Sequence, residues 1–251
     1  MVKVVIIGAG NVALHLLKAF EECTKIDVLQ MYSRSIKKTE NNISFTTDYT
    51  KIKDADIYII AVSDDAIPSV SKKLTHKKGL VVHTSGSVPM HVLSKNSRYG
   101  VFYPLQTFSK EQEVDFSTVP ICIEAKNKTG LDLLTSLGNL VSRNVQEVSS
   151  EQRKSLHLAA VIVNNFTNHL YHLGNTICEE KNVSFELLKP LILETVKKLD
   201  TSSPFNAQTG PAKRGDKGTI KSHLNQLKDE NLKKIYSILS QSINNTYEKK
   251  L

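Results

Sequence analysis

The 251-residue chain has no tryptophan, few other aromatic residues and only three cysteines. Cys23, Cys122 and Cys178 lie far apart and form no Cys-x-x-Cys pair. An odd, scattered set argues against a disulfide framework or a zinc site and fits a reducing compartment. No apolar run approaches the ~20 residues that a membrane-spanning helix needs. We therefore expect no metal site and no membrane partner.

The chain enters a predicted strand at once, without a basic leader, so we also expect no signal peptide and a cytoplasmic location. The net charge is +8, but the lysine pairs are spread along the chain and aromatic residues make up only 6%. A nucleic-acid-binding protein more often clusters basic residues with stacking aromatics. We therefore expect a solvated lysine-rich surface and no nucleic-acid partner, although a positive field would help to capture a polyanionic cofactor.

The first thirteen residues indicate a strand, a glycine turn and a helix. Residues 4–7 are β-branched, Gly8-Ala9-Gly10 breaks the run, and apolar residues then recur at helical spacing. The first glycine permits a tight turn, the second leaves room for a pyrophosphate, and a small third residue lets the helix pack close to the strand. The pyrophosphate would rest on the helix N-terminus. The predicted phosphate-binding residues are Gly8, Gly10, Asn11, Val12 and Ala13; the alternative is a tight turn that binds nothing.

The second predicted strand, residues 26–32, ends in Ser33-Arg34-Ser35. An Asp or Glu at this place of a dinucleotide fold binds the 2′-hydroxyl of NAD, whereas small hydroxyls with an arginine suit the 2′-phosphate of NADP. We therefore predict NADP rather than NAD, bound through Ser33, Arg34 and Ser35. The alternative is an exposed turn arginine without a partner.

Two further predicted strands, residues 56–62 and 80–82, end in small or polar residues. Open α/β sheets bind ligands at the carboxyl ends of their strands. We expect the following residues to line the cofactor: Ala61, Val62, Ser63, His83 and Thr84. Ser85 is predicted to orient the substrate and Ser87 to bind it, although an ordinary polar loop would have the same composition. Asp64 or Asp65 is predicted to cap the next helix.

Strands and helices alternate over residues 1–148, which predicts an α/β fold with a doubly wound, mostly parallel sheet. The pattern changes near Ser149, where Ser149-Ser-Glu-Gln152 is a capping box and only helices follow. We predict an NADP-binding Rossmann domain over 1–148 and an all-helical domain over 149–251.

The long helix predicted from the capping box to about Glu180 is apolar on nearly its whole circumference, a pattern typical of a buried helix. A polar stripe at helical spacing interrupts it, formed by His157, Asn164, Asn168 and Tyr171. Buried polar groups need partners, so the stripe indicates an internal network, a subunit interface or a substrate site. We favour a substrate site facing the cofactor. His157 is the predicted acid or base, because histidine ordinarily titrates near neutrality. Asn164 is predicted to orient the substrate and Asn168 to bind it.

Residues 203–216 form a long segment rich in Gly, Pro and hydrogen-bonding side chains. Loops of this length inside compact domains are often functional. We predict that Arg214 pairs with a substrate carboxylate or phosphate; the alternative is a surface turn arginine.

Five stretches carry a resemblance to known proteins: residues 8–13, 83–87, 103–108, 157–165 and 209–216. They resemble the two-domain dehydrogenase superfamily of prephenate dehydrogenases, pyrroline-5-carboxylate reductases and β-hydroxyacid dehydrogenases. The chain is more closely similar to an uncharacterised bacterial family, in which a Rossmann-like NADP-oxidoreductase domain precedes a helical domain of unknown function. The resemblance implies NADP binding, a homodimer formed through the helical domain and reductase activity. It adds Gln106 to the predicted substrate-binding residues and leaves open whether Arg214 serves its own or a partner's site.

The resemblance breaks at two catalytic positions. Prephenate dehydrogenases carry a catalytic histidine just before the proline matched by Pro104, where this chain has Tyr103. β-Hydroxyacid dehydrogenases carry a lysine four residues before the asparagine matched by Asn164, where this chain has Ala160. Pyrroline-5-carboxylate reductase chemistry is least contradicted. We predict hydride transfer between NADP(H) and a small polar carbonyl or imine bound between the two domains; the alternative is a non-catalytic NADP-binding sensor or scaffold.

Overall fold

The structure is a computed structural model that describes residues 1–35, 43–110 and 112–248. The chain divides into two compact units, Met1–Val163 and Asn164–Leu251. We call the first the sheet unit and the second the helical unit. β8 ends at Glu147 and α4 begins at Ser150, where the sequence predicts the change from sheet to helix, and α4 belongs to the sheet unit.

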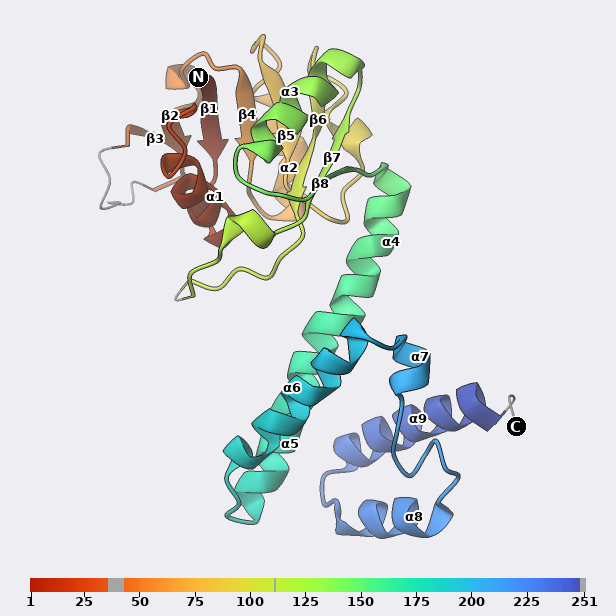
Figure 1. Cartoon of the computed structure of the whole chain (residues 1–251). Helices are drawn as coiled ribbons and strands as arrows, with labels where there is room; N and C mark the ends of the chain where they lie inside the picture. The colour runs from red at the N-terminus through yellow and green to blue at the C-terminus, as the bar shows by residue number, and fades with distance from the viewer. Residues whose placement is uncertain (36–42, 111, 249–251) are drawn as a thin grey trace. The chain divides into compact units, whose positions relative to one another are not determined.

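Within the described residues, the strands form one sheet in the order β3-β2-β1-β4-β5-β6-β7-β8 (Figure 1). Their bounds are β1 Val2–Ile7, β2 Ile26–Tyr32, β3 Phe45–Thr46, β4 Ile57–Ile60, β5 Leu80–His83, β6 Tyr99–Pro104, β7 Ile121–Ala125 and β8 Val145–Glu147. Neighbouring strands are parallel except for the antiparallel pair of β6 and β7. The predicted mostly parallel, doubly wound sheet is confirmed.

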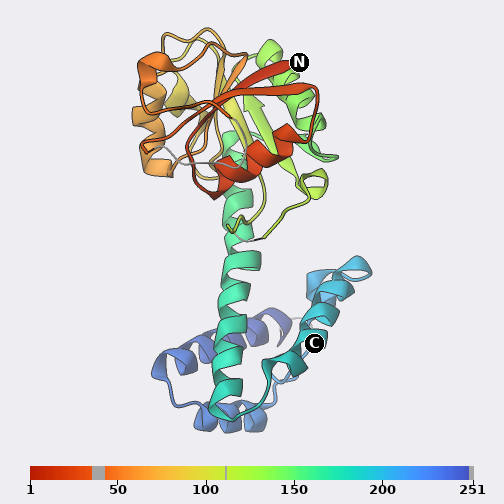
Figure 2. The ribbon, with the colours of Figure 1, turned by 90° about the vertical axis from the view of Figure 1, so that its left-hand side faces the viewer.

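Helices cover both faces of this sheet, because its strands carry apolar side chains on each side (Figure 2). α1 (Asn11–Glu21) and α3 (Lys128–Asn139) share a core with the sheet residues Val4 and Ile6. The neighbouring residues Val5 and Ile7 point to the opposite face and pack in the core that includes α2 (Ile67–Lys72). Strand alternation thus divides one apolar run between two cores.

The strand order reverses at β1, which has β2 on one side and β4 on the other. In open α/β sheets such a switch point creates a crevice at the carboxyl ends of the strands. The loops after β1 and β4 therefore lie side by side, at the place where the sequence predicts the cofactor.

α4 (Ser150–Ala160) starts with the predicted capping box, in which the Ser149 hydroxyl accepts from the Gln152 N–H and the Gln152 side chain accepts from the Ser149 N–H. Leu156 on this helix packs against a small core that contains Tyr103 of β6 and Cys122 of β7. This contact holds α4 on the sheet unit.

In the helical unit, the helices are α5 Thr167–Glu180, α6 Lys189–Lys197, α7 Pro204–Ala207, α8 Lys217–Gln226 and α9 Glu230–Tyr247. A π-helical turn, Val161–Phe166, lies between α4 and α5. The predicted polar stripe assumes 3.6 residues per turn along its whole length. Because a π-helical turn takes up more residues, the stripe does not continue at that spacing from His157 to Asn168.

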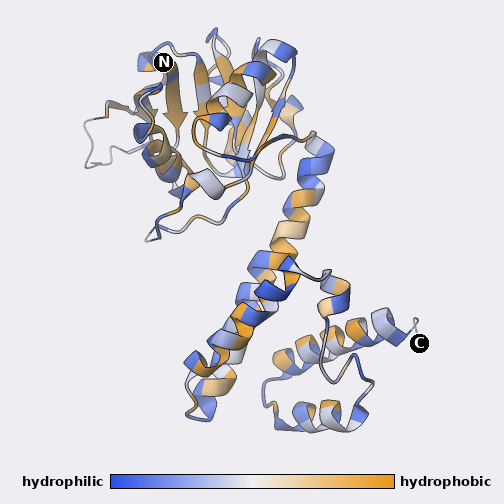
Figure 3. Ribbon diagram, viewed as in Figure 1, coloured by the Kyte–Doolittle hydropathy of each residue, from blue (hydrophilic) through white to orange (hydrophobic). Residues whose placement is uncertain are grey.

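The prediction that this long helical stretch is buried is wrong for the single chain. Val163 is 70% exposed, Leu158 63% and Phe166 58%. Figure 3 shows the apolar residues along the end of α4 and the turn that follows. An apolar pattern predicts that a helix face avoids water, but it does not say what covers that face.

Candidate active site

A cavity of about 860 Å³ lies at the carboxyl ends of the strands around the switch point. This volume is in the range of small-molecule and cofactor sites. The cavity is lined by Gly8, Ala9, Gly10, Asn11, Val12, Tyr32, Ser33, Arg34, Ser35, Tyr49, Ala61, Val62, Ser63, Ala66, Ser69, Val70, Thr84 and Phe108. Of the residues predicted to bind the cofactor, all but Ala13 and His83 belong to this lining.

The glycine turn fits the pyrophosphate of a dinucleotide. Gly8 has φ +129°, and a Cβ on it would lie 2.1 Å from the Ala61 carbonyl oxygen, so neither the conformation nor the space admits a side chain. A Cβ on Gly10 would meet no described atom within 4 Å, which leaves the backbone open toward the cavity. Gly10 is also the N-cap of α1 and has no side chain to occupy the first N–H groups of the helix. Ala13 is fully buried and packs in the core between α1 and the sheet.

The other end of the cavity carries the groups predicted to recognise the 2′-phosphate. Ser33 is buried, whereas Arg34 and Ser35 are exposed, and all three line the cavity. The rings of Tyr32 and Tyr49 stack here with centroids 4.0 Å apart. Burial raises the pKa of Tyr49, so its hydroxyl stays protonated at neutral pH. The sequence reasoning missed both tyrosines, although Tyr32 ends the strand that precedes the predicted site.

The segment after β6 is fastened to α1 beside the cavity. The Asn11 side chain donates to the Phe108 carbonyl over 2.9 Å, and His15 Nε2 lies 2.8 Å from the Ser109 carbonyl. Lys18 forms an ion pair with Glu113 one turn further along α1. Asn11 therefore uses its side chain to hold this segment, while Phe108 lines the cavity.

The loop after β5 is shaped by its own side chains. His83 ends the strand, is fully buried, and accepts the Ser85 N–H at Nδ1 over 3.1 Å. Burial, with a contribution from Arg153, lowers the pKa of His83 to about 3, so the ring is neutral. The Ser85 hydroxyl accepts from the N–H groups of Ser87 and Val88 over 3.1 and 3.0 Å. A direct contact of His83 with the cofactor, and of Ser85 with the substrate, stays a prediction.

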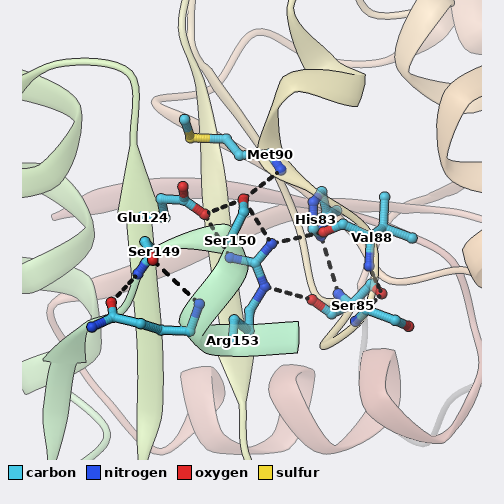
Figure 4. A network of polar contacts seen from close by, with 10 residues as sticks. His83, Ser85, Val88, Met90, Glu124, Ser149, Ser150 and Arg153 are labelled. Carbon is cyan, nitrogen blue, oxygen red and sulfur yellow. Dashed lines mark hydrogen bonds and ion pairs between the residues drawn. The ribbon is translucent and has the colours of Figure 1, made fainter. Parts of the chain in front are cut away.

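Arg153 ties α4 to this loop (Figure 4). Its side chain is 1% exposed and pairs with Glu124 of β7 over 2.6 Å. The guanidinium also donates to the Ser85 carbonyl over 3.2 Å and to the Val88 carbonyl over 2.7 Å. A buried ion pair is stable only when further hydrogen bonds satisfy the charges, and the loop carbonyls provide them. The sequence signal for this anchor was available, because Arg153 precedes His157 by four residues and so shares its helix face.

One turn beyond Arg153, His157 meets Tyr103 of β6. The Tyr103 hydroxyl lies 3.1 Å from His157 Nδ1. Gly86 packs against this pair: a Cβ there would lie 2.6 Å from His157 Nδ1 and 2.9 Å from Tyr103 Cζ. Neither Tyr103, His157 nor Gly86 is among the residues that line the cavity, whereas Thr84, two residues before Gly86, is.

The prediction that Asp64 or Asp65 caps a helix is wrong. The short helical turn Asp64–Ala66 begins after Ser63, and α2 has Ala66 as its N-cap, so both carboxylates lie inside the first turn. The Asp64 carboxylate instead accepts from the Ser87 hydroxyl over 2.6 Å. Ser87 is exposed, as is Gln106, whose side chain accepts the Thr107 N–H.

The remaining predicted substrate residues, Asn164, Asn168 and Arg214, lie in the helical unit and are exposed. Their contact with a substrate stays a prediction. Among the described residues, no group of three or more His, Cys, Asp or Glu side chains is arranged to hold a metal ion. The described helices include none that is long and apolar enough to cross a bilayer.

Comparison with known proteins agrees with this geometry. Residues 3–86 match the domain family described as NADP oxidoreductase coenzyme F420-dependent, and residues 119–243 match a domain of unknown function, DUF2520. A Bacteroides fragilis protein provisionally assigned as an NADP oxidoreductase is 39% identical, with a TM-score of 0.88 over 97% of this chain and 98% of the other. None of the curated proteins matches this sequence.

Two more distant structures show the same fold. A Thermotoga maritima protein is 23% identical and has a TM-score of 0.74, with 98% of each chain covered. The pyrroline carboxylate reductase of Plasmodium falciparum, solved with NADP bound, is 14% identical and has a TM-score of 0.65, with 97% of this chain and 98% of the other covered.

The full-length match and the domain matches confirm both the predicted resemblance and the predicted cofactor. The glycine turn, the cavity and these matches lead to one conclusion: the chain belongs to the NADP oxidoreductase family.

Proposed function

We propose that the chain transfers a hydride between NADP(H) and a small polar carbonyl or imine compound. The observation that carries this proposal is the Tyr103–His157 pair, packed on Gly86 in the loop whose first residue, Thr84, lines the cavity. Reduction of a C=O or C=N bond adds a hydride to carbon and a proton to oxygen or nitrogen. A histidine packed on a loop that contributes to the cavity lining offers a group for the proton.

The cavity residues support the cofactor half of the proposal. The first turn of α1 would hold the pyrophosphate through its N–H groups, and Arg34 would pair with the 2′-phosphate. When bound, the nicotinamide supplies or accepts the hydride. The stacked rings of Tyr32 and Tyr49 would border the adenosine end.

The residues predicted to contact the substrate support the part of the proposal that concerns the substrate. His157 would donate or accept the proton. The other predicted substrate contacts are Ser85, Ser87, Gln106, Asn164, Asn168 and Arg214. The polar character of this set favours a substrate that carries hydrogen-bonding groups or a carboxylate. The likeness of the fold to pyrroline carboxylate reductase supports an imine as the first substrate to test.

A non-catalytic NADP-binding sensor is the second candidate. Tyr103 and Ala160 stand where related dehydrogenases carry ionisable catalytic residues, which favours it.

A panel of cyclic imines, 2-keto acids and 3-hydroxy acids tests the proposal, with NADPH oxidation or NADP reduction followed by absorbance. We expect turnover of at least one compound, and His157→Ala should lower that turnover ~100-fold or more. NADPH affinity, measured by calorimetry, should be unchanged. His91→Ala is the matched control, because His91 is exposed in a separate helical turn, Met90–Leu93.

Cofactor binding without turnover across the whole panel would favour the sensor. Equal turnover of His157→Ala and the wild type would remove His157 from the mechanism.

A further inference from the structure

We propose that Tyr103 is a positioning residue that holds His157 in the tautomer with its proton on Nε2. The ring then presents an N–H donor, rather than a lone pair, to the substrate. The assignment of the tautomer stands on geometry alone. The use of that N–H in a reaction rests on the proposed function.

The argument starts from the hydrogen bond between the two side chains. The Tyr103 hydroxyl and His157 Nδ1 are 3.1 Å apart, and Tyr103 is only 9% exposed. Across residues 1–35, 43–110 and 112–248, no other group forms a hydrogen bond with this hydroxyl. A buried hydroxyl donates wherever an acceptor exists, because an unpaired O–H would lose its hydrogen bond to water. The acceptor here is His157 Nδ1, so that nitrogen carries the lone pair.

The protonation state of Tyr103 supports a hydrogen bond that its hydroxyl donates to His157. Burial, with the nearby Cys122, raises the pKa of Tyr103 to about 12. The phenol therefore remains a donor through the neutral range. A neutral imidazole has one N–H, and with Nδ1 accepting, that N–H is at Nε2.

Close packing supports this arrangement of the half-buried His157 ring. Gly86 lies so close that a single added carbon would stand 2.6 Å from Nδ1 and 2.7 Å from Cγ of His157. One turn earlier, Arg153 fastens α4 to the carbonyls of Ser85 and Val88, on either side of Gly86. The glycine and the arginine thus hold the histidine ring, and Tyr103 selects its tautomer.

This arrangement has a chemical consequence under the proposed function. An Nε2–H donor polarises a carbonyl oxygen or an imine nitrogen without bringing a fixed charge to the site. When His157 also gives up this proton, its Nδ1 must take up a proton from solvent, so that the ring stays neutral. His83 provides an internal comparison, because its Nδ1 accepts the Ser85 N–H and its ring is fully buried. His83 should show the same tautomer for a reason that does not involve Tyr103.

The test is a two-bond ¹H–¹⁵N correlation spectrum of the full chain labelled with ¹⁵N-histidine, recorded above the pH at which histidines titrate. Loss of signals in His157→Gln assigns that ring. In the wild type we expect an unprotonated Nδ1 and a protonated Nε2. In Tyr103→Phe the His157 Nδ1 signal should shift toward the protonated position, while the His83 signals stay in place.

Tyr99→Phe is the matched control, because it removes a hydroxyl from the same strand at a residue whose ring faces Lys126. It should leave the His157 signals unchanged. A protonated Nδ1 in the wild type would overturn the inference, and this reading does not depend on the folding of any Tyr103 variant. An unshifted His157 Nδ1 in folded Tyr103→Phe would also overturn it.

Turnover is a separate readout. With an active substrate, Tyr103→Phe should lower kcat about tenfold and leave NADPH affinity unchanged. Absence of turnover in the wild type would contradict the proposed function, and the spectrum would still decide the tautomer. An unchanged kcat beside a shifted signal would overturn the catalytic use of the N–H while supporting the positioning.

Discussion

The two units of this protein bury their side chains very differently. The sheet unit has fully buried residues on both faces of its sheet and a buried arginine beside them. Among the described residues of the helical unit, only Ala212 is buried, and apolar side chains such as Leu191 and Leu193 are 63% and 69% exposed. The sheet unit thus contains its own core, whereas the apolar faces of the helical unit have no cover within the described single chain.

This difference in burial indicates different roles for the two units. The sheet unit, which has its own core, contains the cavity, the loop after β5 and the Tyr103–His157 pair. The predicted homodimer would cover the apolar faces of the other unit. We therefore expect substitutions in the sheet unit to act on stability and cofactor binding, and those on the apolar faces of the helical unit to act on assembly.

The largest effect should come from the buried ion pair. Arg153→Met leaves the Glu124 carboxylate without its positively charged partner and two loop carbonyls without a donor. We expect the free energy of unfolding to fall by about 4 kcal/mol, measured by urea denaturation followed by circular dichroism. Lys154→Met, its exposed neighbour, should change it by less than about 0.5 kcal/mol. Equal losses in the two variants would show that the buried network does not hold the sheet unit together.

The second prediction compares the two units directly. Ile59 of β4 is fully buried, so Ile59→Ala should lower the free energy of unfolding by about 3 kcal/mol at any protein concentration. Leu191→Glu on α6 should instead shift the predicted homodimer toward monomer, measured by sedimentation. An unchanged oligomeric state in Leu191→Glu would mean that this face does not join two copies.

The third prediction concerns the two arginines proposed for anion binding. Arg34 lines the cavity and Arg214 does not. Arg34→Asp should weaken NADP about 100-fold and spare NAD, because it replaces the partner of the 2′-phosphate with a like charge. Arg214→Asp should leave the affinity for both dinucleotides unchanged. Calorimetry distinguishes these results, and equal NADP affinity in Arg34→Asp and the wild type would refute the 2′-phosphate assignment.

The smallest effect depends on pH and on the buried His83. Its pKa is about 3 in the folded chain, below the ordinary value of 6.5, so the unfolded chain binds the proton more readily. Stability should therefore fall as the pH falls from 6.5 toward 3, by about 2 kcal/mol between pH 6.5 and 5 from this group. His83→Gln should flatten this part of the profile, whereas His91→Gln should leave it as in the wild type. Identical slopes in all three proteins would show that His83 is not buried as a neutral ring.

Local patterns predicted the elements well, because strand composition and helix caps act over a few residues. The turn at Gly8, the capping box at Ser149 and the strand ending at Tyr32 are all present. Asp64 was predicted wrongly, because a helical turn starting one residue earlier turns a capping position into a first-turn position. The predicted polar stripe that begins at His157 does not continue at the same spacing through the π-helical turn. Neither helix propensity nor residue spacing reveals such a turn in the sequence.

The sequence by itself determined the dinucleotide fold, since a glycine turn between a buried strand and a helix has few other uses. It also indicated NADP through Arg34. Only the tertiary structure brought together Tyr103, Gly86, Arg153 and His157, which come from a strand, a loop and a helix far apart in the chain. Such long-range contacts depend on strand order and on which face of the sheet a helix covers, and no short pattern in the chain specifies either.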